Sequence, residues 1–151
     1  MAETVARSLN EQLWPLLKKE RFVLLNTVDK DIGSPNASAI SWVYAPNPST
    51  ILLAVDNRSR IIENINSNQN VTLTVIGAGS VYSIIGTASI LQEKMEGVPL
   101  KLASIEVQIK EVRDVMFYGS RISVEPQYEK TYDKQAAEKL DNQVMKALKG
   151  T

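Results

Sequence analysis

A short segment in the first half of the chain combines the residue types that bind anions. It is AVDNRSRIIENI, residues 54–65, and it passes from an apolar run into a helical pattern. Asp56, Asn57 and Ser59 favour the N-cap of a helix, where backbone N–H groups are unpaired and the dipole is positive. Arg58 and Arg60 add two guanidinium groups, whose planar forks suit phosphate oxygens. The segment predicts a phosphate site at a helix N-terminus, or else an ordinary capped helix with two surface arginines.

The amino-acid composition excludes most of the chemistry that side chains perform alone. The 151 residues include no cysteine and no histidine. Thiol nucleophiles, thiolate metal sites and a Ser-His-Asp triad are therefore excluded, and zinc or His-ligated haem is disfavoured. If the protein catalyses a reaction, we expect a cofactor to supply the reactive group, and pure binding roles stay open.

The charge and hydropathy of the chain bear on its partners and its location. Lys plus Arg and Asp plus Glu both number 17, so no overall charge favours nucleic acid or a membrane surface. No apolar run is long enough to cross a bilayer, and the start, MAETVARSLNEQLW, lacks the apolar stretch of a secretory signal. We therefore expect a cytoplasmic protein without disulfides, with no nucleic-acid or membrane partner.

The elements that must position the anion segment follow from the spacing of apolar residues. Leucines at helical spacing predict a helix over residues 5–17, although Pro15 weakens its end. The APNPS sequence predicts a turn. Strands are expected at 22–28, 37–44 and 51–55, and a short helix at 59–66.

The second half of the chain continues as strands and ends in a helix. Strands at 71–76 and 81–91 flank GAGS, which predicts a hairpin. Alternation over 101–112 predicts a long strand, a short last strand is expected at 116–124, and apolar spacing predicts a helix over 133–148. We expect one domain over residues 1–151, with an antiparallel sheet closed into a barrel and helices packed outside.

Three aromatic residues on the predicted strands offer surfaces for stacking. Trp42, Tyr44 and Tyr82 could pack on the ring of a bound ligand. Aromatic residues on strands belong more often to the core, so both roles remain open.

The order of these segments resembles that of the pyridoxamine 5'-phosphate oxidase-like, FMN-binding split-barrel family. The strand PNASAISWVY, a turn, the strand ILLAVD and the helix start NRSRIIENI carry the resemblance. Ser59, Arg60 and ENI match the family's Ser-Arg pair and Asn-Ile, and Gly86 matches a glycine in the strand after the hairpin. The resemblance covers roughly residues 5–125. It implies a mainly β fold with flanking helices, an antiparallel split β-barrel of about six or seven strands.

The resemblance also implies how the phosphate of FMN is held. Ser59 and Arg60, helped by Arg58, would bind it. Two residues depart from the family pattern, because the usual Thr at the strand end is Val55 and a Lys that often follows Ser-Arg is Ile61. Losing a charged phosphate contact costs about 1.5–3 kcal/mol, so we expect weaker affinity at an unchanged location.

The remaining contacts implied by the resemblance lie along the ribityl chain and the ring. Val55, Asp56 and Asn57 would lie along the ribityl chain. The residues that would run beside the isoalloxazine ring, with their backbone reading its polar edge, are Ser38, Ala39, Ile40 and Ser41. Barrels of this family dimerise with the flavin at the subunit interface, so a homodimer is implied.

Two functions fit this resemblance best. The first is a flavin-dependent oxidoreductase that uses a small-molecule electron donor, and the second is a non-enzymatic flavin binder such as a carrier, sensor or stress protein. No side chain stands out as an acid or base, so no catalytic residue is named. A true pyridoxamine phosphate oxidase is not expected, because the chain ends in MKALKGT rather than in a basic substrate-binding segment. Haem binding and a deazaflavin enzyme remain as alternatives, disfavoured by the missing histidine and by the neutral net charge respectively.

Overall fold

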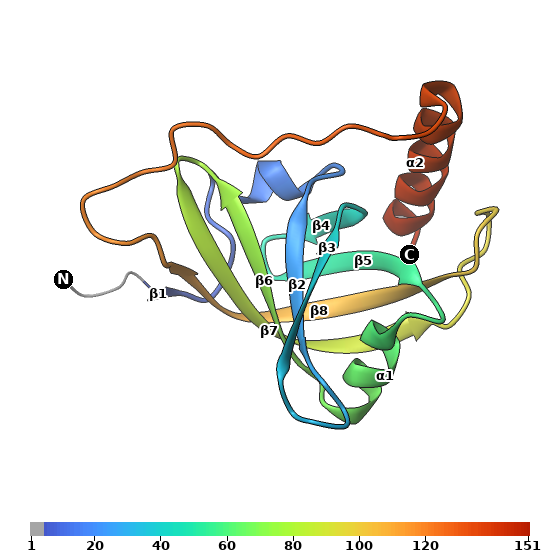
Figure 1. Ribbon diagram of the computed structural model, residues 1–151, viewed down its shortest axis with the longest axis horizontal. Helices are drawn as coiled ribbons and strands as arrows, with labels where there is room; N and C mark the ends of the chain where they lie inside the picture. Colours follow the sequence, from blue (N-terminus) through green and yellow to red (C-terminus); the bar gives the residue numbers. More distant parts are fainter. Residues whose placement is uncertain (1–4) are drawn as a thin grey trace.

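One curved antiparallel sheet organises residues 5–151, the part of the chain that the computed structural model describes (Figure 1). Its strands are β1 (Val5–Ala6), β2 (Val23–Val28), β3 (Pro35–Ile40), β4 (Val43–Asn47), β5 (Thr50–Asp56), β6 (Asn70–Gly77), β7 (Ser80–Gln92) and β8 (Leu102–Asp114). The helices are the short 3₁₀ helix η1 (Trp14–Leu17), α1 (Arg60–Ser67) and α2 (Lys134–Lys149). The fold is therefore mainly β with flanking helices, as predicted.

The strand order explains why the barrel is split. The order is β3-β2-β6-β7-β8-β5-β4, with β1 paired to β8. The edge strands β3 and β4 are consecutive in sequence and are joined by Ser41 and Trp42, so the sheet must curl until its two edges meet. At this corner the carbonyl of Ser41 accepts backbone hydrogen bonds from Arg21 and Val43, both 3.0 Å long. No ladder joins β3 to β4 within residues 5–151. The split barrel is confirmed, and the expectation of a closed sheet is corrected.

The core lies inside the curled sheet, and a second apolar layer lies outside it. Fully buried side chains from six strands fill the interior, including Leu25, Val43, Leu53, Leu73, Ile84 and Ile105. On the outer side, the buried face of α2 packs against Leu52 and Ala54 of β5. Because β5 is covered on both faces, its side chains are buried in succession and do not alternate.

Two glycines in the β6–β7 region have backbone reasons for their presence. The predicted hairpin is confirmed, and its turn residues Ala78 and Gly79 have φ of 52° and 77°, as a tight two-residue hairpin turn requires. Gly86 lies beside an irregularity in the β7–β8 pairing, where a Cβ would come within 2.5 Å of the carbonyl oxygen of Gln108. The close approach of β8 therefore favours glycine at this position.

The predicted helix over residues 5–17 is wrong. Val5 and Ala6 pair with the end of β8, and only Trp14–Leu17 is helical. The side chain of Asn10 accepts bonds from the backbone N–H groups of Gln12 and Leu13, which turns the chain. Leu9, Leu13 and Leu17 are nevertheless buried and Leu16 is partly buried, so the apolar spacing reflects packing against the barrel and not a helix.

Two predicted strands also differ from the structure. Residues 37–44 do not form one strand, because the chain turns at Ser41 and Trp42 and separates β3 from β4. β4 then continues to Asn47, which shortens the predicted turn to Pro48 and Ser49. Residues 116–124 form no strand, and the chain turns where β8 ends, because the Asp114 side chain accepts a hydrogen bond of 3.1 Å from the backbone N–H of Met116.

The other predicted elements are confirmed within two residues at each end. These include the strands at 22–28, 51–55, 71–76, 81–91 and 101–112 and the helices at 59–66 and 133–148. Across residues 5–151, no helix has both the length and the apolar character needed to span a membrane.

Candidate functional site

A cavity of about 530 Å³ lies at the split, between the β3–β4 corner and the end of β5. Its volume is in the range of small-molecule sites. It is lined by Phe22, Ser38, Ala39, Ile40, Ser41, Trp42, Ala54, Val55, Asp56, Ser59, Ile61, Tyr128 and Lys130. Seven of the ten residues predicted to contact a cofactor are among them: Ser38, Ala39, Ile40, Ser41, Val55, Asp56 and Ser59. The other three, Asn57, Arg58 and Arg60, are not among its lining residues.

The turn from β5 into α1, which we call the cradle (Asp56–Arg60), borders this cavity. The hydroxyl of Ser59 accepts a hydrogen bond of 3.1 Å from the backbone N–H of Ile61, so Ser59 is the N-cap of α1. The backbone N–H of Ser59 in turn donates to the carbonyl of Asp56 at 3.0 Å. The predicted helix start is therefore confirmed, and it sets a capped helix N-terminus at the cavity edge.

The guanidinium of Arg60 is engaged by carboxylates from the β2–β3 turn. Its Nε and Nη2 donate to Asp29 at 2.9 and 3.1 Å, and Nη2 also donates to Asp31 at 2.7 Å. The bond from Arg60 is the main reason that the pKa of Asp29 is well below its ordinary value, followed by bonds from Asn36 and from backbone N–H groups. Asp29 is buried, whereas the Arg60 side chain is 47% exposed. The sequence could not foresee these partners, because they are about thirty residues away.

Arg58 and Asn57 have different surroundings. The Arg58 side chain is 80% exposed and lies 3.4 Å from the carboxylate of Asp56, whose pKa its hydrogen bond lowers. Asn57 donates from Nδ2 to the carbonyl of Glu93 at 3.1 Å, and its backbone N–H donates to Lys101. It lines a neighbouring cavity between α1 and β7. Asn57 is therefore turned toward the 93–101 connection.

The cavity also has an aromatic wall, formed by Phe22, Trp42 and Tyr128, which the sequence predicted only in part. Trp42, one of three stacking candidates, lines it, whereas Tyr44 packs near α2 and Tyr82 packs against the core. Phe22 and Tyr128 were not predicted, and their ring centroids are 6.4 Å apart. Tyr128 lies in the connection between β8 and α2, and no sequence pattern indicated that it would lie near the cradle.

The titratable groups on the wall are paired. Burial, followed by the bond to Glu20, raises the pKa of Tyr128 above its ordinary value. Burial opposes the charge of Lys130, but its contacts with Asp141 and Glu20 outweigh that effect and raise its pKa. With Asp56 held by Arg58, every titratable side chain lining the cavity has a partner. The lining therefore offers no free acid or base.

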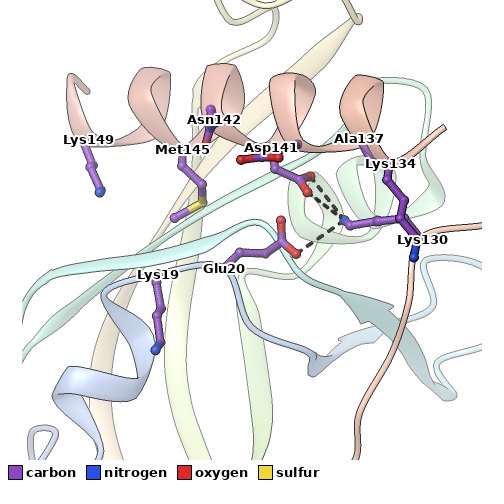
Figure 2. Close-up of a pocket in the computed structure, with 10 residues that line it drawn as sticks. Lys19, Glu20, Lys130, Lys134, Ala137, Asp141, Asn142, Met145 and Lys149 are labelled. Atoms are coloured by element: carbon purple, nitrogen blue, oxygen red, sulfur yellow. Dashed lines mark hydrogen bonds and ion pairs between the residues drawn. The ribbon is translucent and has the colours of Figure 1, made fainter. Parts of the chain in front are cut away.

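A second concavity shares Lys130 with this cavity. It measures about 500 Å³ and lies between α2 and the chain just before β2 (Figure 2). In Figure 2 Glu20 and Asp141 point toward the ammonium of Lys130, while Lys19 and Lys149 stand at the other end. Within residues 5–151, no group of histidine, cysteine or carboxylate side chains is suited to hold a metal ion.

Comparisons with known proteins extend these observations. The sequence model of pyridoxamine 5'-phosphate oxidase matches residues 9–146. No curated protein matches the sequence.

Solved structures resemble the fold at low sequence identity. A Lactobacillus delbrueckii protein provisionally named a pyridoxamine 5'-phosphate oxidase has a TM-score of 0.61 at 20% identity, covering 74% of this chain and 98% of its own. General Stress Protein 26 from Bacillus anthracis has a TM-score of 0.54 at 14% identity, covering 68% and 91%. An F420 reductase has a TM-score of 0.55 at 17% identity, covering 65% and 93%. At these identities the likeness concerns the fold alone.

Proposed function

This chain belongs to the pyridoxamine 5'-phosphate oxidase family, and from that premise we propose that it binds FMN in the split and acts as a flavin-dependent oxidoreductase. One observation carries the proposal. Seven residues chosen for flavin contact from the sequence line a single cavity, although they come from two separate segments of the chain. Proteins of this family often bind flavin, and a flavin would supply the hydride and electron chemistry that this chain's side chains lack.

The ring end of the cavity suits a flat heterocycle. The backbone of Ser38–Ser41 lies at the sheet edge, where β3 has no partner strand on its outer side within residues 5–151. The backbone N–H and C=O groups that point outward from Ser38–Ile40 are available to the polar edge of a ring, whereas the carbonyl of Ser41 already accepts bonds from Arg21 and Val43. Ile40 and Val55 add apolar surface, and Trp42 adds an aromatic side chain.

At the other end of the cavity, a phosphate can bind Arg60 only if it displaces one of the two carboxylates to which Arg60 donates hydrogen bonds. Ser59 offers a hydroxyl, which can still donate while it caps α1. Asp31 is 62% exposed and contacts Arg60 through one oxygen, so a phosphate would replace it at small cost. Asp29, which is buried and bonded to Arg60 through both oxygens, would stay in place and orient the guanidinium.

The absence of a free acid or base on the cavity wall favours a second candidate. A non-enzymatic flavin carrier, sensor or stress protein needs only the binding groups. Steady-state turnover of NADH or NADPH with excess FMN distinguishes an oxidoreductase from such a binder. Turnover above that of free flavin supports the enzyme, and none with several donors supports the binder. Reconstitution with FMN, with the deazaflavin F420 and with haem would identify the cofactor.

Replacing both arginines of the cradle tests the placement. Because the Arg58 and Arg60 side chains are 80% and 47% exposed, Arg58→Ala/Arg60→Ala should still fold, with a modest loss of stability because Asp29 loses its partner. It should weaken FMN binding about ten- to a hundredfold, measured by flavin fluorescence quenching. The matched control is Arg7→Ala/Arg121→Ala, which removes two exposed arginines elsewhere. Unchanged FMN affinity in the cradle variant, or an equal loss in the control, would overturn the placement.

We also propose a homodimer with the flavin at the subunit interface, in the cytoplasm, served by a small-molecule electron donor. Large apolar side chains stand exposed after β8, with Phe117 69% and Tyr118 87% accessible. Such exposure is compatible with burial by a second copy. Sedimentation of the protein with and without FMN tests the dimer, and a monomer under both conditions would contradict it.

A further inference from the structure

A long connection closes one side of the cavity. Residues 115–133, between β8 and α2, contain no helix or strand, and they run along the molecule to α2 (Figure 1). Connections of this length without secondary structure usually serve a site or act as linkers. We call its second half, residues 125–133, the strap. Tyr128 and Lys130 of the strap line the cavity, so this connection contributes to the site.

An ion triad holds the strap to two other parts of the fold. The Nζ of Lys130 lies 3.4 Å from Oε1 of Glu20 and 3.1 Å from Oδ2 of Asp141 (Figure 2). The three side chains are mostly buried, with 26%, 19% and 17% exposed for Lys130, Glu20 and Asp141. Glu20 precedes β2 and Asp141 belongs to α2, so the triad joins three segments that are far apart in sequence. A second salt bridge, Arg21–Glu125, fixes the start of the strap.

Each carboxylate of the triad also holds an aromatic side chain of the cavity. The hydroxyl of Tyr128 donates to Oε1 of Glu20 at 2.6 Å. The indole N–H of Trp42 donates to Oδ1 of Asp141 at 2.9 Å. Both rings line the cavity. The position of the aromatic wall therefore depends on two carboxylates that share one counterion.

The ammonium of Lys130 stabilises two carboxylates that lie close together. Glu20 and Asp141 face the same ammonium, and Oε2 of Glu20 is buried with no hydrogen-bond partner among residues 5–151. Without a cation between them, two partly buried carboxylates repel each other and lose a charge-assisted bond. Either carboxylate would then move toward water and carry its aromatic partner with it.

We propose that Lys130 is a positioning residue: it holds Glu20 and Asp141 so that Tyr128 and Trp42 set the aromatic wall for a planar ring. The role in binding rests on the proposed flavin function. The position of the wall in the ligand-free protein does not. Lys130 touches the ligand cavity, but its effect on affinity runs through the two rings.

Neutralising Lys130 tests the proposal. Lys130→Met keeps the length of the side chain and removes its charge. The matched control is Lys134→Met, which lines the same concavity but has no ion pair among the described residues. We expect Lys130→Met to weaken FMN affinity about tenfold, less than a fully buried pair would give because the triad is partly exposed. Lys134→Met should bind as the wild type does, and Lys130→Arg should restore most of the affinity.

A readout without flavin separates this proposal from the proposed function. In a Trp14→Phe background Trp42 is the only tryptophan, and its emission should shift to longer wavelength in Lys130→Met and not in Lys134→Met. If the wild type fails to bind FMN but this shift occurs, the flavin function fails and the positioning role stands. Wild-type emission and wild-type FMN affinity in Lys130→Met would overturn the role of Lys130.

A second variant covers the case in which Lys130→Met does not fold. Lys130→Met/Asp141→Asn removes one of the two repelling charges, and the amide oxygen of Asn can still accept the indole N–H. We expect Trp42 emission near that of the wild type, with FMN affinity still reduced because Glu20 and Tyr128 are released. Wild-type affinity in this double variant would contradict the proposal.

Discussion

The cradle around Ser59 and the strap around Tyr128 border the same cavity, but their contacts span very different lengths of chain. In the cradle, Ser59 caps Ile61 and Asp56 holds Arg58, each across two residues. At the strap, Tyr128 reaches Glu20 across 108 residues and Trp42 reaches Asp141 across 99. The helix cap in the cradle follows from local chemistry, whereas Arg60 and Asn57 also have partners 29 to 36 residues away. The contacts around the strap depend on the curl of the sheet and on the packing of α2 against it.

The largest expected effect concerns the buried tie between the cradle helix and the β2–β3 turn. Asn64 of α1 is 1% exposed, donates to the hydroxyl of Thr27 at 3.0 Å and accepts from the backbone N–H of Lys30 at 3.1 Å. Asn64→Ala leaves these groups unpaired and should lower the free energy of unfolding by about 1–3 kcal/mol, measured in urea. Asn66→Ala, on the exposed face of the same helix, should change it by less than about 0.5 kcal/mol. Equal stability of both variants would show that the cradle is held by local contacts alone.

A smaller effect is expected at the strap. Tyr128→Phe keeps the ring and removes the hydrogen bond to Glu20, so we expect a loss of about 0.5–1.5 kcal/mol in thermal unfolding. Tyr132→Phe is the control, because Tyr132 is 49% exposed and its hydroxyl has no partner within residues 5–151. If the two variants melt together, the long-range bond contributes nothing to the strap.

The pH dependence of stability should report the pairing of Asp29 with Arg60. The ordinary pKa of Asp29 is 3.8, and folding lowers it. The ionised Asp29 therefore adds its full share to the free energy of unfolding above pH 3.8, and this share is lost as the pH falls toward the lower pKa of the folded state. The melting temperature of the wild type should therefore exceed that of Asp29→Asn at pH 7, and the gap should narrow near pH 3. The effect is modest because Arg60 is about half exposed. A gap that widens on acidification would contradict the sign.

The smallest expected effect is a gain in affinity. Asp31→Asn removes the exposed carboxylate that competes with a phosphate for Arg60, so FMN should bind about two- to fivefold more tightly. Glu96→Gln removes an equal charge at an exposed position that has no ion pair with any residue of 5–151, and it should leave the affinity unchanged. Weaker binding in Asp31→Asn would mean that the carboxylate helps to orient Arg60.

Much of the fold and part of the site were predictable from particular residues. Short apolar segments predicted β5, β6 and β7, alternation predicted β8, and Ser59 predicted the start of α1. The leucines at 9, 13 and 17 were misleading, because burial against a curved sheet at irregular turns can mimic helical spacing. The β3–β4 corner was missed because alternation continues through Ser41 and Trp42 although the chain turns there.

By itself, the sequence determined the limits that composition sets on the chemistry and the helix cap at Ser59, because these depend on residue type and on neighbours within a turn of chain. Only the tertiary structure decided that Ser38–Ser41 and Val55 line the same cavity as Ser59, since the curl of the sheet brings its edges together. It also decided that Arg60 is held by Asp29 and that Lys130 joins Glu20 to Asp141. Ion pairs across such sequence distances depend on how packed elements meet, and no local pattern encodes them.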